Sequence, residues 1–145
     1  MNCIVLGATK GMGRALSRAL VVRGDTVCLL GRNQEELQKT ARDLQVRGDL
    51  EQEPQTVICD LEEPETFSKA LDVAVMALGE VDLVVVTAGI FATQDALDND
   101  ALLAQQLMQV DFVQTIEFCE QAKERLLRNG GGTLCVFSSV AGDRG

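Results

Sequence analysis

Short apolar runs alternate with helical patterns along the whole chain, and this alternation constrains the fold more than any other feature. The runs are almost continuously apolar, rich in Val, Ile, Leu and Cys, and bounded by polar residues or glycine. Runs of this kind are typical of parallel strands whose two faces are both covered by helices. The five predicted strands are 2–6, 26–30, 56–59, 81–86 and 133–137.

Patterns with a helical period lie between these runs. Apolar residues recur at the spacing of one helix face, and the fourth pattern is the longest, extending from about Asp100 to Arg128 before a glycine triplet. We interpret the polar segments 47–54 and 92–99 as loops. The apolar positions of the first three predicted helices are Met12, Ala15, Leu16, Ala19 and Leu20; Leu37, Ala41 and Leu44; and Phe67, Ala70, Leu71, Ala74, Val75 and Leu78.

The order of these elements predicts an α/β fold with one domain over residues 1–145. Right-handed crossovers place alternating strands and helices in a doubly wound parallel sheet of the Rossmann type, with the strand order 3-2-1-4-5. A chain of this length buries enough surface for one hydrophobic core. Ligands of such sheets bind at the carboxyl ends of the strands. We therefore expect function to reside in the segments that follow the strands.

Charge and composition argue against several classes of function. The net charge of −9 disfavours nucleic acid as a partner, because a phosphate backbone requires a basic face. No apolar run approaches the length of a membrane span, and the N-terminus lacks the pattern of a secretory signal. We expect a cytoplasmic protein with no membrane association. Residues 1–50 carry a net charge of +3 and residues 51–145 carry −12, so an anionic ligand is expected to bind the first third.

The metal-ligating residue types are sparse and scattered. The chain has no histidine, and its cysteines are odd in number and lie singly inside apolar stretches. This distribution predicts buried, reduced thiols and no metal site. The cysteines are Cys3, Cys28, Cys59, Cys119 and Cys135.

A glycine-rich loop separates the first predicted strand from the first predicted helix. Residues 7–13 read Gly-Ala-Thr-Lys-Gly-Met-Gly and lead directly into the helical pattern. Glycine permits a tight turn and lets a pyrophosphate approach the backbone N–H groups at the positive end of the helix. A tight turn needs glycine even without a ligand, so the strand before the loop and the helix after it are what favour nucleotide binding.

The Gly-x-x-x-Gly-x-Gly spacing of this loop resembles that of the short-chain dehydrogenase/reductase family, and three further segments match the family in order. Cys59-Asp60-Leu61 resembles the segment that contacts adenine, and Thr87-Ala88-Gly89 looks like the Asn-Ala-Gly motif with Thr in place of Asn. Residues 138–142, Ser-Ser-Val-Ala-Gly, resemble the catalytic-serine segment. The resemblance implies cofactor-binding roles for Gly7, Thr9, Lys10, Gly11, Met12, Gly13, Asp60, Leu61, Thr87, Ala88 and Gly89.

The end of the second strand indicates which nicotinamide cofactor is preferred. An NAD(H) site usually has an acid there to bind the ribose hydroxyls, whereas this chain reads Leu-Gly-Arg-Asn at 30–33. Arg32 is placed to meet a 2′-phosphate, and Lys10 resembles the other basic position of NADP(H)-preferring members. We therefore expect NADP(H) rather than NAD(H). The alternative is that both are solvated surface charges.

Only part of the catalytic set implied by the resemblance is present. Ser139 corresponds to the serine that orients the substrate, and Asp111 stands where many members carry a supporting Asn. The chain contains no tyrosine, so we expect the Tyr-x-x-x-Lys motif, and the last strands of the family fold, to lie beyond Gly145. Taken singly, Asp60 is also explained as a turn residue or helix cap, Ser138 and Ser139 as the end of a strand, and Asp111 as an interruption of an apolar helix face.

Two functions of different classes follow. The first is an NADP(H)-dependent oxidoreductase that acts on a small-molecule carbonyl or alcohol; the second is a non-catalytic NADP(H)-binding module or subunit. The fourth helical pattern carries more apolar surface than one sheet face needs, and the resemblance implies that it packs across the interface of a homodimer or homotetramer. Its apolar residues are Leu103, Leu107, Val110, Val113, Phe118, Cys119, Ala122 and Leu126.

Overall fold

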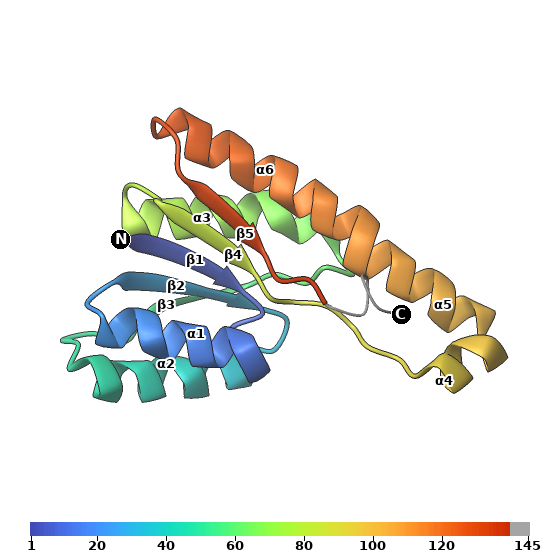
Figure 1. The fold of residues 1–145 in the computed structure, drawn as a ribbon. Helices are drawn as coiled ribbons and strands as arrows, with labels where there is room; N and C mark the ends of the chain where they lie inside the picture. Colours follow the sequence, from blue (N-terminus) through green and yellow to red (C-terminus); the bar gives the residue numbers. More distant parts are fainter. Residues whose placement is uncertain (140–145) are drawn as a thin grey trace.

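A computed structural model describes residues 1–139 and shows a parallel sheet covered by helices on both faces (Figure 1). Within those residues the sheet has five strands in the order β3-β2-β1-β4-β5, and every neighbouring pair is parallel. The predicted α/β fold and its strand order are confirmed. The strands are β1 (Asn2–Leu6), β2 (Thr26–Gly31), β3 (Gln55–Ile58), β4 (Leu83–Val86) and β5 (Thr133–Val136).

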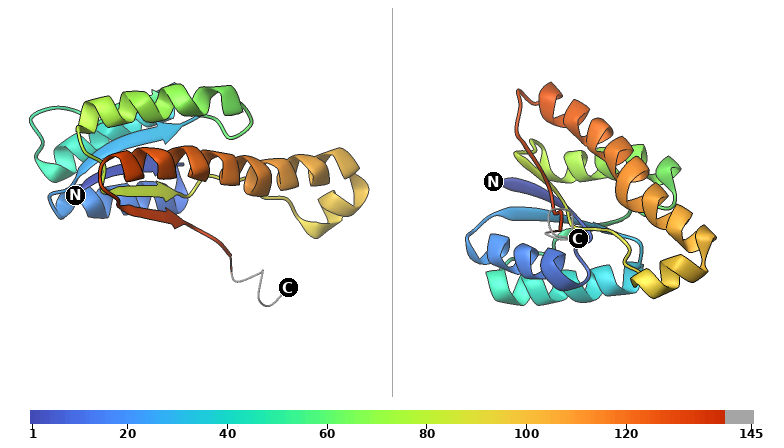
Figure 2. Two further views of the ribbon diagram at one scale, coloured as in Figure 1. Left: turned by 90° about the horizontal axis from the view of Figure 1, so that it is seen from above. Right: turned by 45° about the vertical axis from the view of Figure 1, so that its right-hand side comes forward.

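The side chains of the central strands alternate between two hydrophobic cores. Cys3 and Val5 of β1 point to one core, and Ile4 and Leu6 point to the other. Because both faces are buried, the strand reads as a continuous apolar run. Helices α1 (Gly11–Val22) and α2 (Gln34–Gly48) cover the first face, and α3 (Phe67–Leu78) and α6 (Thr115–Arg128) cover the second (Figures 1 and 2).

The segment 92–99 is not the loop that its polar composition predicted. It contains helix α4 (Gln94–Asn99), whose first turn is capped by Thr93, since the Thr93 hydroxyl accepts a hydrogen bond from the backbone N–H of Ala96 at 3.3 Å. A polar composition does not prevent a helix when a capping residue satisfies its first N–H groups. The loop predicted at 47–54 is also shorter, because α2 continues to Gly48.

The fourth helical pattern is likewise not one uniform helix. It consists of α5 (Ala101–Met108), a π-helical segment η2 (Gln109–Gln114) and α6. We name α4, α5 and η2, residues 94–114, the projecting arm, because α4 and α5 extend past the sheet (Figures 1 and 2). A 3-10 turn, η1 (Pro64–Thr66), precedes α3.

The cysteines are free thiols, but they are not all buried as predicted. Cys3, Cys28 and Cys59 lie in the cores, whereas Cys119 and Cys135 are half-buried because they lie near the edge formed by α6 and β5. Within residues 1–139, no helix combines the length and the apolar character that a membrane crossing requires.

Candidate functional site

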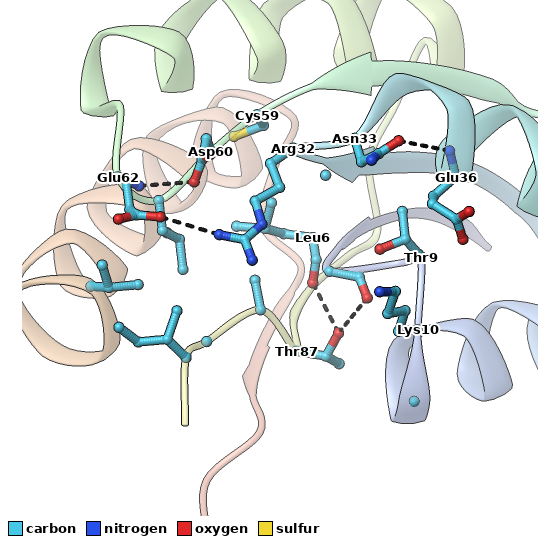
Figure 3. A pocket seen from close by; sticks show the side chains of 18 of the residues that line it. Leu6, Thr9, Lys10, Arg32, Asn33, Glu36, Cys59, Asp60, Glu62 and Thr87 are labelled. Atoms are coloured by element: carbon cyan, nitrogen blue, oxygen red, sulfur yellow. Dashed lines mark hydrogen bonds and ion pairs between the residues drawn. The ribbon is translucent and has the colours of Figure 1, made fainter. Parts of the chain in front are cut away.

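The carboxyl ends of β1, β2, β3 and β4 surround a cleft of about 500 Å³ (Figure 3). This volume lies within the range of small-molecule and cofactor sites. The loops that follow these strands supply most of its wall, as expected for an open parallel sheet. All the residues predicted to bind the cofactor line this cleft, with the exception of Gly13.

Gly13 lies behind the cleft, where it allows two loops to approach closely. A Cβ atom at this position would lie 2.2 Å from the carbonyl oxygen of Gly7 and 2.4 Å from Oγ1 of Thr87. Gly7 is equally constrained, since its φ is +92° and a Cβ there would lie 2.5 Å from the backbone nitrogen of Ala88. Both glycines are therefore required by packing between the first helix and the loop after β4.

Gly11 differs from these two glycines because it opens onto space. Its φ is +49°, and apart from its chain neighbours and the backbone of its own helix, a Cβ atom built on it would meet no atom of residues 1–139 within 4 Å. Helix α1 begins there, and in the described structure its first turn has neither a side-chain cap nor an acidic residue. The backbone N–H groups and the positive end of the helix dipole are thus available to an anion in the cleft.

Arg32 extends from the end of β2 across the cleft to the turn after β3 (Figure 3). Its Nη1 donates a hydrogen bond to Oε2 of Glu62 at 3.1 Å. The Arg32 side chain is 62% exposed, and the Glu62 side chain is 33% exposed. The basic residue predicted from the sequence is therefore in the cleft, but it is paired with an acid.

The sequence prediction missed Asn33, Glu36 and Glu62, which also line this cleft. The Asn33 side chain caps α2 by accepting a hydrogen bond from the backbone N–H of Glu36 at 3.0 Å. An Asn followed three residues later by a Glu is a helix-start signal, so this pair was recognisable from the sequence. No spacing pattern indicated Glu62.

Glu36 is held by two cations. Its carboxylate accepts hydrogen bonds from Lys39 at 3.1 Å and from Arg14 at 3.2 Å. The hydrogen bond and the charge of Lys39 lower the pKa of Glu36 below its usual value. Glu36 is therefore an ionised residue of the wall whose charge is already matched by neighbouring side chains.

The end of β3 contributes Cys59, Asp60 and Leu61. Asp60 forms a turn in which its Oδ1 accepts a hydrogen bond from the backbone N–H of Glu62 at 3.0 Å. The turn role that the sequence left open is therefore real, and Asp60 lines the cleft as well. Burial raises the pKa of the Cys59 thiol to about 12, so this cysteine is protonated and unsuited to act as a nucleophile.

Thr87 replaces the asparagine of the family motif and ties the loop after β4 to the glycine loop (Figure 3). Its hydroxyl lies 3.0 Å from the carbonyl oxygen of Leu6 and 3.3 Å from that of Gly7. The hydroxyl thus bridges the two carbonyl groups at the end of β1, and the carbonyl oxygen of Leu6 also accepts a hydrogen bond from the backbone N–H of Thr87 at 2.8 Å. The Thr87-Ala88-Gly89 segment is thereby positioned along the cleft.

Asp111 lies in the π-helical segment η2, beside the end of this loop. Its Oδ1 accepts a hydrogen bond from the backbone N–H of Ile90 at 2.8 Å, and a Cβ on Gly89 would lie 3.0 Å from the same oxygen. The residue therefore does more than interrupt an apolar face: it joins the projecting arm to the loop after β4. π-Helical turns of this kind are frequent at functional sites.

Ser138 and Ser139 follow β5 at the same edge of the sheet, and both are exposed. They do not contribute to the wall of the cleft, which ends at the loop after β4 and at Val110. The remainder of their motif, Val140, Ala141 and Gly142, lies outside the described residues. The structure thus gathers the predicted nucleotide-binding residues in one place and sets the predicted catalytic serine apart on the neighbouring strand.

Comparison with known proteins agrees with this geometry. The family model for short chain dehydrogenases matches residues 2–145. An oxidoreductase of Streptomyces coelicolor is 34% identical over 99% of this chain and 56% of its own length. Carbonyl reductase family member 4 of Danio rerio is 30% identical over 98% of this chain and 57% of its own length.

The solved structures show the same architecture. A short chain dehydrogenase from Shigella flexneri in complex with NADP superposes with a TM-score of 0.86 at 27% identity, over 99% of this chain and 61% of that one. The chain thus spans about half the length of the relatives that it matches. The match over nearly all residues, together with the fold and the cleft at its strand ends, shows that the chain belongs to the short-chain dehydrogenase family of oxidoreductases.

Proposed function

We propose that this chain forms the NADP(H)-binding portion of an oxidoreductase that transfers hydride to or from a small-molecule carbonyl or alcohol. The observation that carries the proposal is the wall of the cleft. It combines an uncapped helix N-terminus behind a glycine loop with Arg32, which occupies the end of β2 where an NAD(H) site usually has an acid. One relative of known structure is a complex with NADP.

The residues of the cleft fit each part of the cofactor. The open surface at Gly11 and the first turn of α1 would receive the pyrophosphate. The turn formed by Asp60 and Leu61 would contact the adenine, and Thr87-Ala88-Gly89 would lie along the path to the nicotinamide. Lys10 and Arg32 would face the 2′-phosphate, because both are cationic and both line the cleft.

Bound NADP(H) would supply or accept the hydride, and the chain itself would position the substrate. Ser139 would donate a hydrogen bond to the substrate oxygen, and Asp111 would hold the loop after β4 in place through its bond to the N–H of Ile90. The sequence contains no tyrosine, so the proton donor that the family resemblance implies is not among its 145 residues. Cofactor binding is consequently the activity to test on this chain.

The test is a titration of the protein with NADPH and with NADH, before and after the substitution Arg32→Ala. Loss of a charge-assisted contact with the 2′-phosphate, about 1.5–3 kcal/mol, weakens NADPH binding at least tenfold. NADH binding is expected to stay nearly unchanged, because NADH lacks that phosphate. Arg42→Ala is the matched control, since Arg42 is an exposed arginine of α2 that pairs with Glu53 at 3.6 Å.

Equal losses for both cofactors in Arg32→Ala would contradict the NADP(H) assignment. An equal loss of NADPH affinity in Arg42→Ala would show that general surface charge, rather than Arg32, attracts the cofactor. Failure of the unsubstituted protein to bind either cofactor would overturn the proposal as a whole.

We also propose that the protein is a cytoplasmic homodimer or homotetramer. The free thiols fit a reducing compartment. The projecting arm and the start of α6 expose Leu102, Met108, Phe112 and Ile116, which fits an interface with a second copy. Phe112→Glu is expected to lower the mass measured by light scattering to that of the monomer. An unsubstituted protein that already has the monomer mass would refute this part.

A further inference from the structure

The pair formed by Arg32 and Glu62 joins two separate loops across the mouth of the cleft (Figure 3). Arg32 follows β2, and Glu62 lies in the turn after β3. Their 3.1 Å contact occupies one of the guanidinium nitrogens that a 2′-phosphate would use. An incoming phosphate must therefore share Arg32 with this carboxylate or displace it.

Glu62 is held in this position from two sides. Its backbone N–H donates to Asp60 Oδ1 at 3.0 Å, which fixes the turn. Its other carboxylate oxygen, Oε1, accepts a hydrogen bond from the side-chain amide of Gln106 in α5. The turn places the backbone of Glu62 beside Arg32 and the contact with Gln106 orients its carboxylate there, so Glu62 is positioned to compete for the guanidinium.

The other acids of the cleft wall are engaged elsewhere. Glu36 accepts hydrogen bonds from Arg14 and Lys39, and Asp60 Oδ1 is used by its own turn. Among the ion pairs of residues 1–139, Arg32 has Glu62 as its partner. Glu62 is thus the acid of the cleft wall whose removal most directly leaves the Arg32 guanidinium available to a ligand.

We infer that Glu62 sets the strength of the preference for a 2′-phosphate by competing with that phosphate for Arg32. The inference rests on the proposed NADP(H) function and adds to it a residue that acts through Arg32. Ion pairs as exposed as this one contribute little free energy. We therefore expect the competition to lower the affinity for a ligand with a 2′-phosphate by about two- to fivefold. The effect is confined to ligands that carry the 2′-phosphate.

The test uses adenosine 2′,5′-bisphosphate and 5′-AMP as probes in calorimetric titrations of the protein at low salt. Glu62→Gln keeps the shape and the hydrogen bond acceptor but removes the charge. We expect it to tighten binding of the bisphosphate two- to fivefold and to leave binding of 5′-AMP unchanged. Glu63→Gln is the control. It also removes one negative charge, but from the neighbouring residue, whose side chain does not line the cleft.

A double substitution separates competition from general repulsion. If Glu62 acts through Arg32, Glu62→Gln has no effect on bisphosphate binding once Arg32 is replaced by alanine. The inference would be overturned if Glu62→Gln still tightened bisphosphate binding in the Arg32→Ala background, or if Glu63→Gln tightened it equally. Either result would show that the acid acts by long-range repulsion of the phosphate groups. Weaker bisphosphate binding in Glu62→Gln would also overturn it, because Glu62 would then be orienting Arg32 toward the phosphate.

The same titrations distinguish this inference from the proposed function. An unsubstituted protein that binds the bisphosphate no better than 5′-AMP would overturn the NADP(H) preference, and the role of Glu62 with it. A clear preference for the bisphosphate that Glu62→Gln leaves unaltered would overturn the role of Glu62 alone.

Discussion

The packed sheet and the projecting arm differ in how their apolar residues are used. In the sheet and its covering helices, large side chains such as Phe67 and Phe118 are fully buried and meet edge to face with ring centroids 5.5 Å apart. In the arm, Leu102 is 77% exposed and Phe112 is 58% exposed. Within the described chain, neither α4 nor α5 contains a buried residue.

This difference separates two sources of stability. The packed sheet is stabilised by burial of its own side chains. In the arm, η2 buries Val110 in the same core, whereas α4 and α5 depend on capping residues, and the arm makes a few polar contacts with the rest of the chain. Two of those contacts reach the wall of the cleft: Asp111 binds the N–H of Ile90, and Gln106 binds Glu62. The least packed part of the molecule therefore touches two residues that line the cleft.

The largest expected effect comes from truncating the two phenylalanines that represent these regions. Phe118→Ala leaves a cavity beside Phe67 and is expected to lower the free energy of unfolding by about 3–5 kcal/mol. Phe112→Ala removes an exposed ring and, at a dilution where light scattering gives the monomer mass, is expected to change it by no more than about 0.5 kcal/mol. Urea denaturation at that dilution measures both. Similar losses there would contradict the contrast, because the ring of Phe112 would then be packed within its own chain.

A smaller effect is expected where the arm is joined to the loop after β4. Asp111→Ala leaves the N–H of Ile90 without its acceptor and is expected to cost about 1–3 kcal/mol. Asp111→Asn keeps an acceptor oxygen and is expected to lower the free energy of unfolding by less than Asp111→Ala does. Asp98→Ala, which removes an exposed acid of α4, serves as control and should be nearly neutral. Equal results for the alanine variants at 111 and 98 would show that the contact with Ile90 does not anchor the arm.

The smallest effect concerns an ion pair between α1 and α2. Burial raises the pKa of Asp43, but hydrogen bonds from Arg18 and Arg47 outweigh it, so the pKa lies below its usual value of 3.8. A group with a depressed pKa in the folded state stabilises it above the usual pKa, and this contribution is lost as the pH falls through the folded-state value. We expect Asp43→Asn to destabilise the protein by less than about 1 kcal/mol near pH 6 and by progressively less as the pH falls below 3.8. A difference in melting temperature that stays constant over this range would refute the assignment.

Local sequence patterns predicted the sheet and most of the cleft. Apolar runs that are buried on both faces marked the strands, and the glycine loop marked the start of α1, because each signal depends only on neighbouring residues. The same local chemistry was available for Asn33 and Glu36, which carry a helix-start signal that the sequence prediction did not use. Helix α4 was missed because this short helix has no apolar face with a helical period. Its cap, Thr93, is by itself a weak signal for the start of a helix.

The sequence by itself determined the fold, the edge of the sheet where the cleft forms and the basic residue at the end of β2. Tertiary structure decided what that residue contacts, since Arg32, Glu62 and Gln106 come from three distant segments that meet only when the chain folds. It also decided that Gly13 packs against Gly7 and Thr87 behind the cleft rather than lining it. Periodicity and loop chemistry are local properties, whereas pairing between charges and close packing between loops depend on distances that no single segment specifies.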